Sequence, residues 1–238
     1  MALAAAMPAF AQAPKPTRAS AVQPGFVIPE GRAQIMLFEP DISVSEQTAG
    51  GLAVPSADWT ADARANVETA LVAALAERNI LLNTKPTVAL ADEPLMKDYR
   101  ALFRAIASAA FTHKLFPGDA LPTKSERFDW TLGPGAAALK KLGGGDYGLF
   151  IYSSDAYDSR GRKAVEAIGK LLGEKSEAGT HIGYAGLVDL ETGDLVWVSA
   201  NVKMLGDVRT MEGATLRAEQ LLQGFPARAT TVKVGDAR

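Results

Sequence analysis

Two serines and an aspartate stand where a strand predicted to be buried meets a helix, a location that many hydrolases use for a nucleophile. They are Ser153, Ser154 and Asp155. The nucleophile elbow of such enzymes has the pattern G-x-S-x-G. Here Ile151 and Asp155 occupy the two glycine places, which favours the interpretation that the hydroxyl groups satisfy backbone groups at a strand end. A serine hydrolase with His181 as its base is therefore kept only as a second alternative.

A group of positive charges follows a few residues later. The segment 159–163 (SRGRK) places three cations in the first turn of a helix predicted over 159–172, where the helix macrodipole favours anions. A bound anion would reverse that mismatch, because free N–H groups and guanidinium groups would converge on it. Local pairing with Asp155 and Asp158 is the competing explanation. The candidate site for a small anionic ligand consists of Ser159, Arg160, Arg162 and Lys163.

No other motif indicates a metal or a cofactor. The segment 133–138 (GPGAAA) fits G-x-G-x-x-A, but it lacks the long preceding strand and the long following helix of a dinucleotide site. His113 and His181 are the only histidines, they are far apart, and there is no cysteine. The carboxylates do not form a calcium-binding loop. We therefore expect no metal, no cofactor and no catalytic residue.

These residues must be positioned by strands that alternate with helices. Apolar runs and turn residues predict strands over 33–44, 87–91, 147–153, 182–190 and 195–202, with Pro40 marking a bulge or an edge. Helices are predicted over 59–78 (capped by Asp58 or Thr60), 92–114, 133–143, 159–172 and from a cap at Thr210 to about 224. The expected fold is α/β or α+β: a mixed sheet of about five strands with helices packed on it, ending in an antiparallel hairpin and a C-terminal helix.

The first residues carry information about cellular location. Met1–Ala11 (MALAAAMPAFA) is apolar, ends in an A-x-A pattern and is followed by polar, Pro-rich sequence, which is typical of a secretory leader. No Lys or Arg precedes the run, so either the true start lies upstream of Met1 or the run is a plain Ala-rich helix end. The run is also shorter than the roughly 20 residues that span a bilayer. We expect export by a cleaved leader and no transmembrane segment.

Composition narrows the class further. The 238 residues are 47% hydrophobic and 22% charged, with a net charge of -2, which is ordinary globular composition and gives no overall attraction for nucleic acid. The absence of cysteine excludes disulfides and lipidation on a cysteine, and it fits a Gram-negative periplasm. The predicted organisation is a leader over 1–11, a Pro-rich linker or arm over 12–32, one domain over 33–226 and a tail over 227–238.

The predicted hairpin carries a family resemblance. The segment 185–197 (AGLVDLETGDLVW) resembles the strand, D-x-x-T-G-x-x-x-W, strand segment of bacterial envelope proteins, which include the curli-secretion and penicillin-binding-protein-activator lipoproteins. The strand start at 145–149 (GDYGL) is similar to theirs, and the resemblance covers roughly residues 146–202. It implies an envelope α/β domain that acts by binding or assembly and does not imply a particular partner.

These observations favour a non-enzymatic periplasmic accessory or assembly protein of the cell envelope that acts through contacts with envelope protein partners. The first alternative is a periplasmic binder of a small anionic ligand at the segment 159–163. The oligomeric state and the partner's identity do not follow from the sequence.

Overall fold

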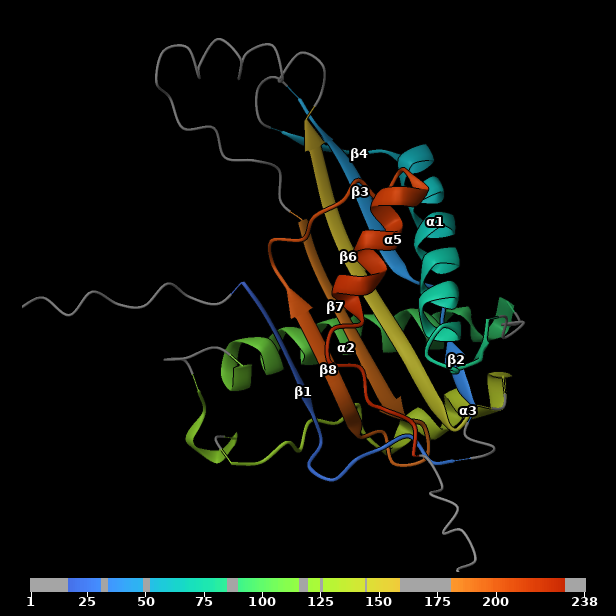
Figure 1. The fold of residues 1–238 in the computed structure, drawn as a ribbon, viewed down its shortest axis with the longest axis vertical. Helices are drawn as coiled ribbons and strands as arrows, with labels where there is room; N and C mark the ends of the chain where they lie inside the picture. Colours follow the sequence, from blue (N-terminus) through green and yellow to red (C-terminus); the bar gives the residue numbers. More distant parts are fainter. Residues whose placement is uncertain are drawn as a thin grey trace, which may run out of the picture.

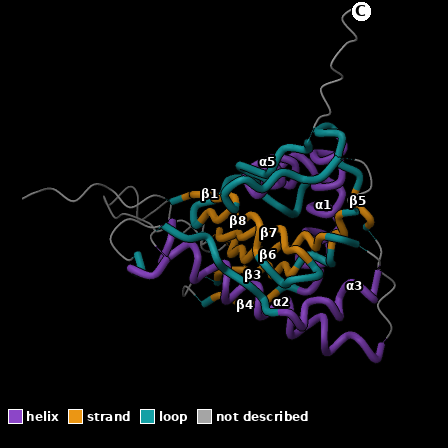
Figure 2. The backbone as a smooth tube through the Cα atoms, turned by 90° about the horizontal axis from the view of Figure 1, so that it is seen from below, coloured by secondary structure: helices purple, strands orange, loops and turns teal. Residues whose placement is uncertain are grey.

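The computed structural model describes residues 17–30, 34–48, 52–84, 90–115, 120–124, 126–143, 145–158 and 181–229. Within these ranges the chain forms an eight-stranded mixed sheet covered by helices on both faces (Figure 1). The expected fold class is confirmed, with more strands than the five predicted. Figure 2 shows the three layers: α1 (Ala57–Ala76) and α5 (Met211–Leu221) lie on one face, and α2 (Glu93–Ala110) and α3 (Ala137–Gly143) lie on the other.

The longest strand, β6 (Tyr147–Asp158), organises the sheet. It pairs antiparallel with β7 (His181–Asp189), which pairs antiparallel with β8 (Leu195–Asn201). On its other side, β2 (Ile35–Leu37) pairs parallel with its first half and β3 (Asp41–Gln47) with its second half. Short strands complete the sheet: β1 (Arg18–Val22) beside β8, β4 (Ala53–Pro55) beside β3 and β5 (Leu82–Asn83) beside β2.

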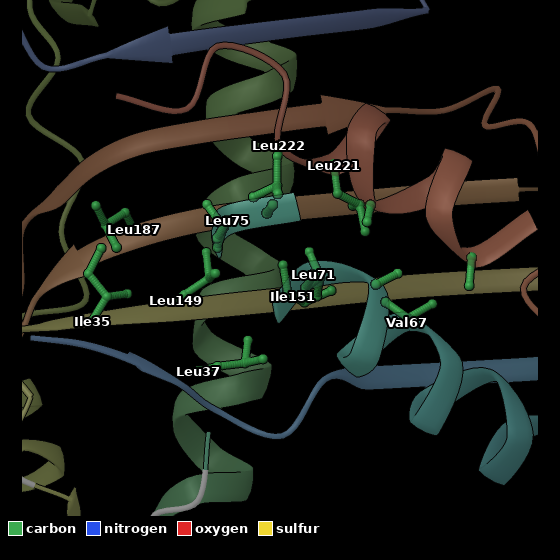
Figure 3. Close-up of a cluster of buried hydrophobic side chains, with 14 of the residues drawn as sticks. Ile35, Leu37, Val67, Leu71, Leu75, Leu149, Ile151, Leu187, Leu221 and Leu222 are labelled. Atoms are coloured by element: carbon green, nitrogen blue, oxygen red, sulfur yellow. The ribbon is translucent and has the colours of Figure 1, made fainter. Parts of the chain in front are cut away.

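Alternation along β6 divides the core in two. Leu149 and Ile151 face α1 and α5, where they meet Leu71 and Leu75 of α1 (Figure 3). Phe150 faces α2 and stacks on Phe103 at a centroid distance of 5.2 Å. Successive strand residues point to opposite faces, so both faces of this strand are apolar because both are covered. The predicted strand over 147–153 was too short at its C-terminal end, since β3 and β7 continue to pair with β6 as far as Asp158 and Asp155.

Proline divides the strand that was predicted over 33–44. Pro40 lies between β2 and β3, and the Ile42 N–H bonds to the Pro40 carbonyl at 3.0 Å. Proline cannot donate to a ladder, so the chain leaves the sheet at this point and rejoins the same neighbouring strand further along. The predicted strand at 87–91 differs as well: residues 85–89 are outside the described ranges, and Leu90–Asp92 form a 3-10 turn.

Two helix caps test the capping predictions. Thr210 caps α5, since its hydroxyl accepts a bond from the Gly213 N–H at 3.1 Å, as expected. Asp58 and Thr60 do not cap α1. The cap is Ser56, whose hydroxyl accepts from the Trp59 N–H at 3.4 Å, because the helix begins two residues before the predicted start. The Thr60 hydroxyl instead accepts a bond from the Val44 N–H of β3 at 3.0 Å.

The segments expected outside the domain take part in the fold where the structure describes them. Within 12–32, expected as a linker or arm, Arg18–Val22 is the edge strand β1 and Ile28 is buried. At the start of 227–238, expected as a tail, Ala227 and Ala229 exchange backbone hydrogen bonds with Ile28 at 3.0 and 2.8 Å. The leader over 1–11, the helix over 159–172 and residues 230–238 lie outside the described ranges.

The geometry of the turn between β7 and β8 accounts for the residues found in it. The Asp189 carboxylate accepts bonds from the Glu191 and Thr192 N–H groups at 2.8 and 3.2 Å. Gly193 has φ +81, and a Cβ there would lie 2.0 Å from the Gly133 carbonyl oxygen. The D-x-x-T-G part of the motif is therefore required by the turn and by close backbone packing. Trp197 is fully buried, and its ring packs edge-on against Phe225.

A second glycine contact fixes how the loop before α5 crosses that helix. Gly206 has φ +92, and a Cβ on Gly213 would lie 2.2 Å from the Asp207 carbonyl oxygen. We predict that Gly213→Ala destabilises the protein by about 1–3 kcal/mol through overpacking, although alanine favours helix by up to about 1 kcal/mol. Chemical denaturation measures this change. The control Thr215→Ala, at an exposed position of the same helix, should shift stability by less than about 0.5 kcal/mol.

Candidate functional site

The structure brings three of the residues singled out in the sequence into one buried cluster. The register of β6 and β7 places Asp155 opposite His181. Ser153, Asp155 and Tyr157 alternate along β6, so they share the face covered by α1 and α5. The His181 imidazole Nδ1 lies 2.7 Å from one oxygen of the Asp155 carboxylate, and the Ser153 hydroxyl donates to the other oxygen at 2.7 Å.

Arg217 on α5 completes the cluster, and sequence reasoning missed it. Its side chain is fully buried and forms an ion pair with Asp155 at 2.8 Å. Every N–H of its guanidinium group has an acceptor: the carbonyls of Leu205 and Gly206, the Ser153 hydroxyl, the Met204 sulfur and the Asp155 carboxylate. A signal was present in the sequence, because the inward positions of α5 are otherwise small or apolar and a charge there requires a buried partner.

The charge state of Asp155 follows from these contacts. Burial opposes ionisation of its carboxyl group, but the hydrogen bond from His181, the positive charge of Arg217 and the hydrogen bonds from Ser153 and Arg217 outweigh it. The pKa of Asp155 therefore lies below its ordinary value, and the group is an anion at neutral pH. Burial raises the pKa of the neighbouring Tyr157 above its usual range, and the negative charge of Asp155 adds to that effect.

This geometry does not assemble a serine nucleophile with a base. The Ser153 hydroxyl is fully buried and donates to a carboxylate, whereas catalysis requires the hydroxyl to donate to the imidazole. His181 bonds to the other carboxylate oxygen. Ser154 is the next residue along β6 and so points to the opposite face, away from this cluster. The Ser153 hydroxyl bonds to the side chains of Asp155 and Arg217 from within β6, and not to the backbone groups at a strand end that the sequence suggested. The hydrolase alternative gains no support from these contacts.

A group of planar side chains contacts the cluster through the His181 ring. The Arg209 guanidinium lies between the rings of Trp59 and Tyr157, at 4.3 and 4.2 Å from their centroids. Two hydrogen bonds of 2.8 and 2.6 Å join it to the Asp207 carboxylate, and the bond from Arg209 lowers the pKa of Asp207. The His181 ring also packs against Tyr157, at a centroid distance of 4.9 Å and a tilt of 46°. The three ring side chains and the guanidinium group thus have neighbours within the fold.

A charged cleft of about 710 Å³ lies elsewhere, between α1 and α2 at the β2–β3 junction. The Glu39 carboxylate joins the two helices there, through Arg64 of α1 at 3.2 Å and Arg100 of α2 at 3.1 Å. Arg104 lies 3.8 Å from Asp41. Cations and carboxylates alternate along this cleft, so most of its charge is neutralised internally. Such partly exposed pairs each contribute little to stability.

The predicted anion site is not among these features. Ser159, Arg160, Arg162 and Lys163 lie outside the described residues, so the anionic-ligand site stays a prediction. Within the described ranges, no group of three or more His, Asp or Glu side chains comes together in a way that could hold a metal ion. None of the helices described is long and apolar enough to cross a membrane.

Comparison with known proteins gives only a distant structural likeness. No family model and no curated protein matches the chain. Among solved structures, it is similar to the PelC dodecamer from Paraburkholderia phytofirmans, with a TM-score of 0.38 and 11% identity over 90% of this chain and 100% of that one. A point variant of that PelC dodecamer gives a TM-score of 0.37 and 10% identity over 89% and 99% of the two chains. Similarity at this level assigns neither a family nor a function.

We predict that the two charges of the buried ion pair are energetically coupled, so that the loss of one partner costs far more than the pair contributes as a whole. Arg217→Met or Asp155→Asn alone should cost about 3–5 kcal/mol, because each leaves one charge buried without its partner. The double variant removes both charges and should lose clearly less than the sum of the single losses. Denaturant unfolding of all four proteins checks this. Arg104→Met is the control, since its pair is exposed and should contribute less than about 1 kcal/mol. Additive losses at 155 and 217 would contradict the prediction.

The same carboxylate predicts a pH dependence. Because the folded-state pKa of Asp155 is lowered, its ionisation stabilises the fold above the unfolded-state value of about 3.9. That contribution is lost as the pH falls through the folded-state pKa. The stability difference between the wild type and Asp155→Asn should therefore shrink as the pH falls below about 4. Unfolding free energies measured above and below this pH test the prediction, and a difference that grows in acid would contradict it.

Proposed function

We propose that this protein is a non-enzymatic accessory or assembly factor of the periplasmic cell envelope that acts through contacts with other proteins. The observation that carries the proposal is the saturation of the buried polar cluster. Ser153, Asp155 and Arg217 all bond to one another or to the loop 204–206. The residues that most resembled catalytic machinery therefore have a role in holding the fold together, and the outer faces of the helices remain for recognition.

The periplasmic location is supported by the sequence. The apolar segment 1–11 with its A-x-A end is typical of a secretory leader. The lack of cysteine fits an exported bacterial protein that is neither lipidated nor cross-linked by disulfides. The D-x-x-T-G-x-x-x-W hairpin, similar to that of envelope lipoproteins, agrees with the same compartment.

The proposal predicts both a mature N-terminus and a physical association. Expressed from its native locus, the protein should be recovered in the periplasmic fraction with an N-terminus at or next to Gln12. Deletion of residues 1–11 should retain it in the cytoplasm. Cross-linking in intact cells should join the exported form to at least one envelope protein, and the cytoplasmic form should lack that product. An uncleaved protein in the cytoplasm, or an exported protein that forms no cross-link, would refute the proposal.

A further inference from the structure

The outer face of α5 combines exposed apolar side chains with acidic ones. Two large apolar side chains are exposed here: Leu216 of α5 at 40% of its area, and Leu205 at 66% in the loop that Gln220 ties to the helix. Leu216 also lines a surface hollow of about 750 Å³, formed between the helix and the loop that carries Gly206. Apolar side chains gathered on one surface indicate a contact site more strongly than scattered ones do. We call Leu205 and Leu216 together with Glu212 and Glu219 the α5 surface.

Its charge is negative and lacks compensation. Glu212 and Glu219 both line the hollow, and seven residues of helix separate them by about 10 Å along the axis. Neither forms an ion pair with another residue in the described part of the chain. Two cations of this region are engaged elsewhere, since Arg217 is paired with Asp155 in the core and Arg209 is bound to Asp207. A partner of opposite charge would gain attraction here that the fold itself does not supply.

The surface is also held in place from within. Gln220 accepts a bond from the Leu205 N–H at 3.0 Å and donates to the Leu205 carbonyl at 3.0 Å. Arg217 bonds to the carbonyls of Leu205 and Gly206 from the inner side. Leu205 thus projects from a loop that is fixed to α5 on both sides. A preorganised surface loses less conformational freedom on binding, which favours recognition.

From these observations we propose that the α5 surface docks a protein partner that presents lysine or arginine beside an apolar side chain. This rests on the proposed function and identifies the surface and the chemistry of its partner. The apolar side chain would cover Leu205 and Leu216, and the cations would meet Glu212 and Glu219. A protein is favoured over a small cation because the hollow is open to solvent, whereas small-molecule sites enclose most of their ligand.

Site-specific photo-cross-linking in intact cells tests the proposal on the full exported chain. A benzophenone amino acid replaces Thr215, which lines the hollow, or Asp98, which is exposed on α2 at the opposite face of the sheet. We expect Thr215 to yield an adduct whose partner peptide, identified by mass spectrometry, contains lysine or arginine. The variant Glu212→Lys/Glu219→Lys should reduce that adduct about tenfold. The matched control Asp98→Lys/Glu126→Lys changes the net charge equally at exposed positions away from α5 and should leave the yield unchanged.

Two further variants separate binding from folding. Lysine at 212 opposes the dipole of α5, so Glu212→Gln/Glu219→Gln is tested as well and should reduce the adduct by a smaller factor with unchanged thermal unfolding. Leu216→Ala should reduce it without any change of charge. An adduct at Thr215 that is insensitive to the charge reversal overturns the proposal, as does an adduct with a second copy of this chain. Adducts from Asp98 alone overturn the α5 surface but preserve the proposed function. No adduct from either position contradicts both.

Discussion

A carboxylate and a guanidinium group face each other in the interior, where β6, α5 and the loop 202–210 meet. The Asp155–Arg217 pair lies 2.8 Å apart with both side chains fully buried. Transfer of two charges out of water costs several kcal/mol for each ion unless every polar atom finds a partner. Here both carboxylate oxygens and all the guanidinium N–H groups do. The pair is tolerated only in this arrangement, which makes it a constraint on the relative positions of all three elements.

The loop that precedes α5 depends on that constraint. It runs outside the sheet, so its backbone groups lack ladder partners and must be satisfied by other means. Arg217 takes the carbonyls of Leu205 and Gly206, and the Tyr157 hydroxyl accepts from the Val208 N–H at 3.0 Å. From α1, the Asn66 side chain bonds to the Val208 carbonyl at 3.3 Å. Side chains from the strand and both helices thus perform the function that a neighbouring strand performs elsewhere in the sheet.

The sequence predicted well those features whose causes are local. The hairpin turn depends on residues within a few positions of one another, such as Asp189 and Gly193, and the cap of α5 depends on Thr210 alone. The α/β class followed from the alternation of apolar strands and helices. The short strands β1, β4 and β5 were not predicted, because two to five residues carry too little periodicity and these pairings depend on a distant strand.

The candidate site could be predicted only in part, and for a related reason. The sequence marked Ser153, Asp155 and His181 as candidates for a hydrolase site. In the fold they form one cluster with Arg217, which is 64 positions from Ser153, and Ser153 and Asp155 bond to this buried charge. The Ser153 hydroxyl donates to the Asp155 carboxylate, so it is not hydrogen-bonded to the His181 imidazole that would have to activate it. An arginine among the small and apolar inward residues of α5 was the available signal, since burial of an unpaired cation is too costly to occur by chance. Sequence identifies such a charge, but only the tertiary structure identifies its partner.

One helix therefore connects the interior to the surface. The inward side of α5 carries the positive charge that Asp155 neutralises, and its outward side carries two carboxylates that nothing in the described structure neutralises. Because Arg217 fixes both the helix and the adjoining loop, the exposed leucines at 205 and 216 are held at a set separation and do not depend on a flexible chain for their placement. Apolar residues of similar volume would stabilise the core about as well as this buried ion pair does. The pair therefore adds little to the free energy of unfolding beyond what such residues would give. The pair also fixes the position of the loop outside it, and with it the α5 surface that we propose for docking.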